Sequence, residues 1–115
     1  MKFTSTHEWV KKEGNLSAVG ITEYAAGELG DIVFVQLPEV GDNVVAGEAF
    51  AEVESVKAVE SVLSPVTGIV KAINEEIIDS PELINEDAYS AWFVKVQVEQ
   101  EGELISQQEY LDLIK

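Results

Sequence analysis

Hydrophobic and polar residues alternate over short distances along most of the chain, a pattern typical of β-strands. Residues 7–12 and 15–21 predict two strands joined across Glu13-Gly14-Asn15, a sequence suited to a hairpin turn. Residues 31–37 and 92–98 predict two further strands, because both segments are rich in β-branched and aromatic side chains. Many short strands with helices at their edges indicate a mainly β fold, either a small barrel or a sandwich.

A short helix is predicted between the second and third of these strands. Thr22 is expected to be its N-cap, and Gly30 is expected to end it in the left-handed conformation. Gly27 lowers the helix propensity by about 1 kcal/mol relative to alanine, so we expect only about two turns.

Two further helical segments are predicted from their capping residues. Ser80 is expected to cap a single helical turn that has Pro81 at its first position. Ser106 and Glu109 have the S-x-x-E spacing of a capping box, which predicts a C-terminal helix.

The segment around Lys57 allows two interpretations. Valine recurs at every third residue, which could mark one side of a helix, at Val53, Val56, Val59 and Val62. Valine is a mediocre helix former, however, and Pro65 and Gly68 follow closely, so the pattern favours two strands at 51–55 and 58–62. Lys57 would then lie at the tip of a hairpin, where other proteins can reach it. The strand register stays open, because no turn placement puts every apolar residue on one face.

Length and composition indicate one domain, residues 1–115, with a hydrophobic fraction of 46%. The net charge of −15, with seven lysines and no arginine, argues against nucleic acid and anionic membranes as partners and favours a basic protein surface. There is no cysteine, which excludes a disulfide framework, a thiolate nucleophile and a zinc–thiolate site. The sequence has neither a signal-peptide core nor an apolar run of membrane-spanning length. We therefore expect a cytoplasmic protein, although a mature mitochondrial protein would have the same pattern.

Lys57 is the only basic residue among ten acidic ones between Glu13 and Val70. An ordinary solvated surface lysine would explain this residue, as it explains most lysines. Its small neighbours Ser55 and Ala58 would nevertheless leave the amine open to a partner protein. The isolation of Lys57 makes it the leading candidate for a functional site.

Several separate motifs occur along the chain in a characteristic order. ESVKA lies within VESVKAVESVLSPVTG; HEWV, VGIT, LGDIVFVQLPEVGD and GEAFAEVES precede it, and INEEIIDSPELIN and NED follow. Through these motifs nearly the whole chain resembles the H proteins of the glycine cleavage system, whose lipoyl-lysine motif typically reads ESVKA. In lipoyl domains a glutamate three residues before the lysine and a glycine eleven residues after it are associated with recognition by the attaching enzymes. Glu54 and Gly68 occupy these two positions. Biotinyl carriers usually have methionines beside the lysine, and SVKAV has none.

The resemblance implies a barrel-sandwich hybrid fold, like that of lipoyl domains, and lipoate in amide linkage to Lys57. It implies a carrier without catalytic residues, which takes the aminomethyl intermediate from the P protein (a pyridoxal-phosphate glycine decarboxylase) to the T protein (an aminomethyltransferase). The L protein, a dihydrolipoyl dehydrogenase, would reoxidise the carrier, and lipoate-attaching enzymes would modify it. The lack of cysteine is consistent with this role, because the redox sulfur must then arrive on a cofactor. We expect a monomer.

Three other functions compete with this interpretation. An H-like carrier could relay lipoate to other acceptors, since NEDAYSAWF lacks the proline and glycines that the family usually has at this place. A binding module could leave Lys57 unmodified. A small enzyme has the least support, because the chain shows no nucleophile–base pair or metal site.

The remaining candidate residues have simpler explanations. His7 is the only histidine, and we expect it in a packed or surface role, because no second metal ligand is evident by spacing. The large aromatic residues are expected in the core, namely Trp9, Phe34, Trp92 and Phe93.

Overall fold

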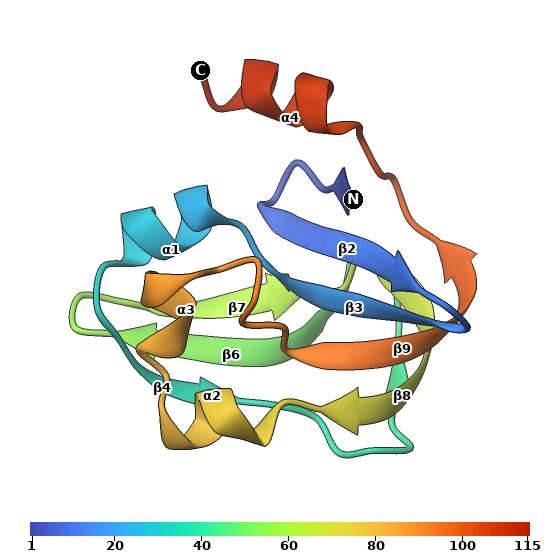
Figure 1. The fold of residues 1–115 in the computed structure, drawn as a ribbon, viewed down its shortest axis with the longest axis horizontal. Helices are drawn as coiled ribbons and strands as arrows, with labels where there is room; N and C mark the ends of the chain where they lie inside the picture. Colours follow the sequence, from blue (N-terminus) through green and yellow to red (C-terminus); the bar gives the residue numbers. More distant parts are fainter.

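The computed structural model describes all 115 residues and consists of two antiparallel β-sheets with short helices at their edges (Figure 1). The six-stranded sheet contains, in spatial order, β1 (Lys2–Phe3), β2 (Glu8–Glu13), β3 (Leu16–Ile21), β9 (Val94–Glu101), β8 (Val66–Ile73) and β5 (Asn43–Val44). The three-stranded sheet contains β4 (Ile32–Gln36), β6 (Ala49–Ser55) and β7 (Val59–Leu63). The four helices are α1 (Glu23–Leu29), α2 (Glu75–Asp79), α3 (Leu83–Glu86) and α4 (Gln107–Leu113). The prediction of a mainly β sandwich with a C-terminal helix is confirmed.

Most buried side chains lie in one core to which both sheets contribute. Val19 and Val96 of the six-stranded sheet and Val53 of the three-stranded sheet are completely buried there. Burial alternates along β6, where Val53 is buried between the exposed residues Glu52 and Glu54. A second cluster lies beneath α4, where Tyr110 stacks on Phe3 with ring centroids 4.8 Å apart. This second cluster fixes the C-terminal helix on the outside of the six-stranded sheet (Figure 1).

The aromatic residues follow the prediction in part. Trp9 and Phe93 are fully buried, as expected, and Trp92 is half-buried. The prediction is wrong for Phe34, which is 49% exposed. The cause is a bulge in β4, where the pairing shifts between Ile32 and Phe34 and so interrupts the regular alternation of buried and exposed residues.

Both predicted hairpins are present. Glu13 pairs with Leu16 at the end of the β2–β3 hairpin, and Gly14 in its turn has a φ of 63°. In the β6–β7 hairpin Glu54 pairs with Val59, so the helical alternative for this segment is wrong. The period of three in valine has no structural meaning, because only two of the four valines are buried: Val53 and Val62 lie in the core, whereas Val56 and Val59 are exposed.

The predicted caps of α1 and α4 are largely confirmed. The Thr22 hydroxyl accepts a hydrogen bond from the Ala25 N–H (3.2 Å), and α1 has seven residues, close to two turns. Gly30 has a φ of 78°, but its ψ of −156° is extended, so the predicted left-handed geometry is wrong. Such a backbone conformation is essentially restricted to glycine. At α4 the capping box between Ser106 and Glu109 is present.

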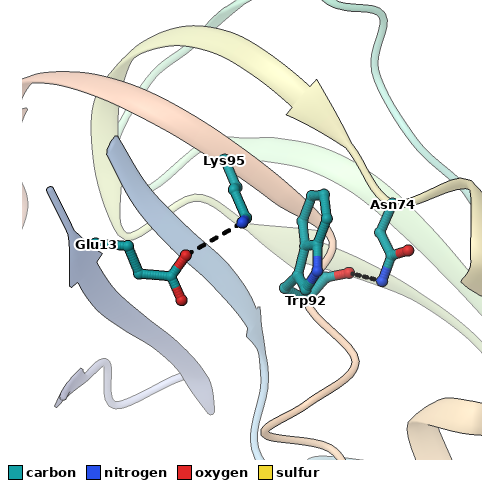
Figure 2. Close-up of polar contacts among 4 residues, drawn as sticks. All are labelled: Glu13, Asn74, Trp92 and Lys95. Carbon is teal, nitrogen blue, oxygen red and sulfur yellow. Dashed lines mark hydrogen bonds and ion pairs between the residues drawn. The ribbon is translucent and has the colours of Figure 1, made fainter. Parts of the chain in front are cut away.

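The prediction for Ser80 is wrong. Ser80 follows the last residue of α2, a helix that the sequence did not predict, and α3 begins at Leu83 without a side-chain cap. Asn74 caps α2 instead, because its Oδ1 accepts a hydrogen bond from the Glu76 N–H (3.2 Å). The Asn74 Nδ2 donates to the Trp92 carbonyl (2.8 Å), a contact across 18 residues that a local pattern cannot reveal (Figure 2).

The structure contains a single ion pair, although the chain has 22 acidic residues. Lys95 Nζ lies 3.2 Å from Glu13 Oε1 and 4.8 Å from the centroid of the Trp92 ring (Figure 2). The surface therefore carries many carboxylates without a basic partner. No helix has the length and apolarity needed to cross a membrane.

Candidate functional site

The tip of the β6–β7 hairpin is held by one buried hydroxyl group. The Ser55 side chain, whose residue is 6% exposed, accepts hydrogen bonds from the N–H groups of Lys57 (3.2 Å) and Ala58 (3.1 Å) and lies 3.3 Å from the Ala58 carbonyl, to which it donates. The Ser55 N–H also donates to the Ala58 carbonyl (2.8 Å). These bonds fix the three-residue turn, so the backbone of Lys57 has a defined position.

A second set of hydrogen bonds joins the tip to the connection between α1 and β4. The Val56 N–H donates to the Asp31 carbonyl (3.0 Å). Asn85 on α3 holds both neighbours of Asp31, because its Nδ2 donates to the Gly30 carbonyl (2.8 Å) and its Oδ1 accepts from the Ile32 N–H (2.9 Å). The hairpin tip and the α1–β4 connection accordingly lie side by side at one end of the molecule (Figure 1).

Lys57 is exposed at this tip and takes part in no ion pair. Its side chain lies against the backbone of Gly30: a Cβ atom at residue 30 would be 3.0 Å from Lys57 Cε and 3.9 Å from Nζ. The backbone conformation of residue 30 therefore requires glycine, whereas an added Cβ atom would displace only the flexible end of the Lys57 side chain. The amine remains accessible to solvent at the end of the hairpin, as the sequence predicted for an attachment site.

A cleft of about 450 Å³ lies beside the hairpin tip, and Ala58, the residue after Lys57, forms part of its wall. Its walls come from residues 6–8, from α1, and from the side of the hairpin that includes Ala58. Half of the twelve lining residues are hydrophobic, and three others carry carboxylates: Glu8, Glu28 and Glu60. The cleft thus combines apolar walls with negative charge, and no lysine lines it.

Glu8 is the most unusual group in the cleft, because its residue is only 3% exposed. Its Oε1 accepts hydrogen bonds from the hydroxyls of Thr4 (2.6 Å) and Thr6 (2.5 Å), and its Oε2 accepts from the Leu63 N–H at the longer distance of 3.4 Å. Burial raises the pKa of Glu8 above its ordinary value, although these hydrogen bonds act in the opposite direction. Glu8 was not among the site residues predicted from the sequence. The available signal was a carboxylate preceded by three hydroxyl residues in TSTHE.

His7 lies beside Glu8 and packs against the C-terminal helix. Its Nδ1 is 2.8 Å from the Tyr110 hydroxyl, which is 2.7 Å from the Thr22 hydroxyl. Burial lowers the pKa of His7, an effect that the nearby carboxylate of Glu28 partly offsets. The His7 ring also lies against the Tyr24 ring, with centroids 4.8 Å apart, so His7 has a packed place in the structure. Its φ of 76° is uncommon for a residue other than glycine. No group of three or more histidines and carboxylates is arranged to hold a metal ion.

The structure brings one of the two predicted recognition residues close to Lys57. Glu54 is exposed on β6, and only Ser55 separates it from the three-residue turn that contains Lys57. Gly68 is buried in β8, a strand that lies on the other side of the molecule from the hairpin tip (Figure 1). A Cβ atom there would lie 2.2 Å from the Gln97 carbonyl oxygen, so close packing of β8 on β9 requires glycine. The recognition roles of Glu54 and Gly68 stay predictions.

The segment in which the sequence departs from the family pattern lies away from the cleft. Asp87 organises it, because its carboxylate accepts hydrogen bonds from the Tyr89 N–H (3.2 Å) and the Ser90 hydroxyl (2.9 Å). Tyr89 packs against Phe3 and Trp9 beneath the C-terminal helix. None of residues 87–93 lines the cleft beside Lys57.

Comparison with known proteins places the chain in one family. The family model for the glycine cleavage H-protein matches residues 1–115. The glycine cleavage system H protein of Treponema denticola is 56% identical over 102 residues, which are 89% of this chain and 84% of the relative. The probable glycine cleavage system H protein of Thermoplasma acidophilum is 50% identical over 115 residues, 100% of this chain and 93% of the relative.

A solved structure agrees with these relatives. The crystal structure of a glycine cleavage system H protein from Mycobacterium marinum superposes with a TM-score of 0.92 at 41% sequence identity, and it covers 96% of this chain and 93% of the other. The shared fold is the lipoyl-type barrel-sandwich that the sequence resemblance implied. The chain therefore belongs to the glycine cleavage H-protein family.

Proposed function

We propose that the protein carries lipoate on Lys57 and is the shuttle, without catalytic residues of its own, of a glycine cleavage system. It would take the aminomethyl group of glycine from the P protein to the T protein, and the L protein would restore the oxidised carrier. Family membership supports this role. The structural observation that carries the proposal is an exposed lysine without an ion-pair partner, held at a hairpin tip by the Ser55 hydroxyl and the Asp31 carbonyl.

The residues around Lys57 fit a lipoyl group. When bound, lipoate supplies the disulfide that this cysteine-free chain lacks, on an arm that raises the effective concentration of the load at each partner's active site. The rigid turn would present the Lys57 amine to an attaching enzyme in one orientation. The cleft lined by Ala58 has apolar walls that would contact the hydrocarbon chain of lipoate, and the carboxylate of Glu8 also lines it.

The position of Glu8 in the cleft supports the proposal that the group carried on lipoate contains an amine. A cationic amine that enters the cleft would favour the charged form of Glu8, because an opposite charge offsets the cost of burying the carboxylate. Glu28 and Glu60 add negative charge to the same walls. The acidic character of the cleft thus suits a protonated aminomethyl load better than a neutral or anionic acyl group.

The proposal is tested by reconstituting the system. Lipoylated protein is mixed with P, T and L proteins, glycine, tetrahydrofolate and NAD⁺, and glycine-dependent NADH formation is followed. We expect turnover with the wild-type protein and with Lys71→Arg, an exposed lysine on β8 that serves as the matched control. Lys57→Arg should abolish turnover, because it keeps the charge but removes the amine that forms the amide. Lipoylated protein that the L protein reduces but that gives no glycine-dependent NADH would contradict the shuttle role.

A further inference from the structure

Exposed apolar side chains gather on the three-stranded sheet next to the hairpin tip. Phe34, Glu54 and Val59 lie in one row across β4, β6 and β7, because Glu54 pairs with both of the others. Phe34 is 49% exposed and Val59 is 57% exposed, so the row forms part of the outer surface. We call these three residues the hairpin face. Val56, which is 68% exposed, follows them at the tip itself.

The hairpin face is an unfavourable arrangement for a carrier that only needs to be soluble. β4 is an edge strand, and exposed apolar residues on an edge strand favour association with other chains. The bulge in β4 places Val33 and Phe34 on the surface in succession, which a regular strand would not do. Bulges of this kind occur preferentially next to functional sites, and clustered exposed apolar residues with a polar surround are typical of protein interfaces.

We propose that the hairpin face is the docking surface for the enzyme that attaches lipoate to Lys57. Phe34 and Val59 make the apolar contacts, and Glu54 between them meets a cationic side chain of that enzyme. The inference rests on the proposed function and adds to it a surface and two contact residues, Phe34 and Val59.

The short reach of a lysine favours the attaching enzyme as the occupant. Five bonds of roughly 1.5 Å place Nζ about 6 Å from Cα, so an enzyme that acylates the Lys57 amine must cover the hairpin tip and its surroundings. Enzymes that act at the far end of a long prosthetic arm need not make these contacts. The hairpin face is contiguous with the tip, because Glu54 is separated from Lys57 by only two residues.

Charge indicates the chemistry of the docking enzyme's surface. Glu52 lies next to Glu54 on the same face of β6, and Asp31 contacts the tip through its backbone. Lys57 is the only base in this part of the chain, so the partner surface is expected to be basic. Docking of Phe34 and Val59 would remove water around Glu54, which strengthens a charge pair formed there. Aromatic residues at the centre of such an interface commonly contribute much of the affinity.

The test measures lipoylation rates of the unmodified protein with a purified lipoate-attaching enzyme, followed by intact mass. We expect Phe34→Ala to lower kcat/KM at least tenfold and Val59→Thr, which keeps the side-chain shape, to lower it severalfold. Val40→Ala is the matched control, because Val40 is 59% exposed and Gly41 beside it donates to the Val70 carbonyl in β8, away from the hairpin. Glu54→Gln should lower the rate and flatten its decrease with rising salt. A cooperative thermal unfolding transition, measured for each variant, serves as the control that the variant is folded.

Two results would overturn the inference. In the first, Phe34→Ala and Val59→Thr are lipoylated as fast as Val40→Ala. In the second, Phe34→Ala protein that has been fully lipoylated by prolonged reaction loses as much turnover with the P protein as it lost with the attaching enzyme, which would assign the face to a different partner. A wild-type protein that accepts no lipoate would contradict the proposed function instead, so the two failures are distinguishable.

Discussion

Substitution of Gly68 by alanine would insert one methyl group between two paired strands. The added Cβ atom would lie 2.2 Å from the Gln97 carbonyl oxygen and 2.8 Å from Val96 Cγ1. The nearest atom belongs to the backbone and not to the end of a flexible side chain, so β8 and β9 must separate by about 1 Å to restore an ordinary contact. Such a separation disturbs the hydrogen bonds between these strands near Gly68 and Val98.

The expected loss of stability follows from two contributions. Overpacking of a rigid site costs about 1–3 kcal/mol, and one or two weakened hydrogen bonds add about 1 kcal/mol each. We therefore expect Gly68→Ala to lower the free energy of unfolding by about 2–5 kcal/mol. For a chain of this size the Tm should fall by about 8–20 °C.

The assay is urea and thermal unfolding followed by circular dichroism, with Gly27→Ala as the matched control. Gly27 lies inside α1 with nothing within 4 Å of an added Cβ atom, so this variant should gain about 1 kcal/mol. A Gly68→Ala protein as stable as the wild type would refute the steric argument. A folded Gly68→Ala protein that the attaching enzyme no longer modifies would show that glycine acts there in recognition and not only in packing.

Three further predictions concern single side chains. Burial raises the pKa of Glu8, so the native protein binds the proton of this carboxyl group more tightly than the unfolded chain does. The unfolding free energy of the wild type, relative to that of Glu8→Gln, should therefore fall as the pH rises above 4.5. An unfolding free energy of the wild type that keeps a constant offset from that of Glu8→Gln at every pH would contradict this prediction. Ser106→Ala should lower the unfolding free energy by about 1 kcal/mol because it removes the cap of α4, and Ser106→Asp should recover most of the loss. Ser55→Ala should accelerate amide hydrogen exchange at Lys57 and Ala58, since both N–H groups lose their side-chain acceptor, and unchanged protection would show that Ser55 does not hold the turn.

The elements that the sequence predicted well are those determined by neighbouring residues. Thr22 and Ser106 cap helices through hydrogen bonds to residues three positions away, and Gly14 allows the β2–β3 turn through its own backbone. These interactions need no tertiary contact, so the pattern of residue types is sufficient. The position of Lys57 at a hairpin tip was also predicted, because the breaker residues downstream favoured two strands over a helix, and the pairing of β6 with β7 decided between the two.

The elements that the sequence did not predict depend on contacts between distant segments. Asn74 caps α2 while it binds the Trp92 carbonyl, and Asn85 holds a connection more than fifty residues away. The exposure of Phe34 results from a bulge whose register is set by pairing with β6. The cleft was likewise invisible, because Glu8 and Ala58 come together only after the sheets have packed.

The central claim is that Lys57 carries the lipoyl group, and the most direct measurement is intact mass followed by peptide mapping of protein expressed in lipoate-supplied cells. The account predicts one added lipoyl group, located on the peptide that contains Lys57, and none on Lys57→Arg protein prepared in the same way. Lipoylation at any other lysine, or wild-type protein that stays unmodified beside an active attaching enzyme, would contradict the account.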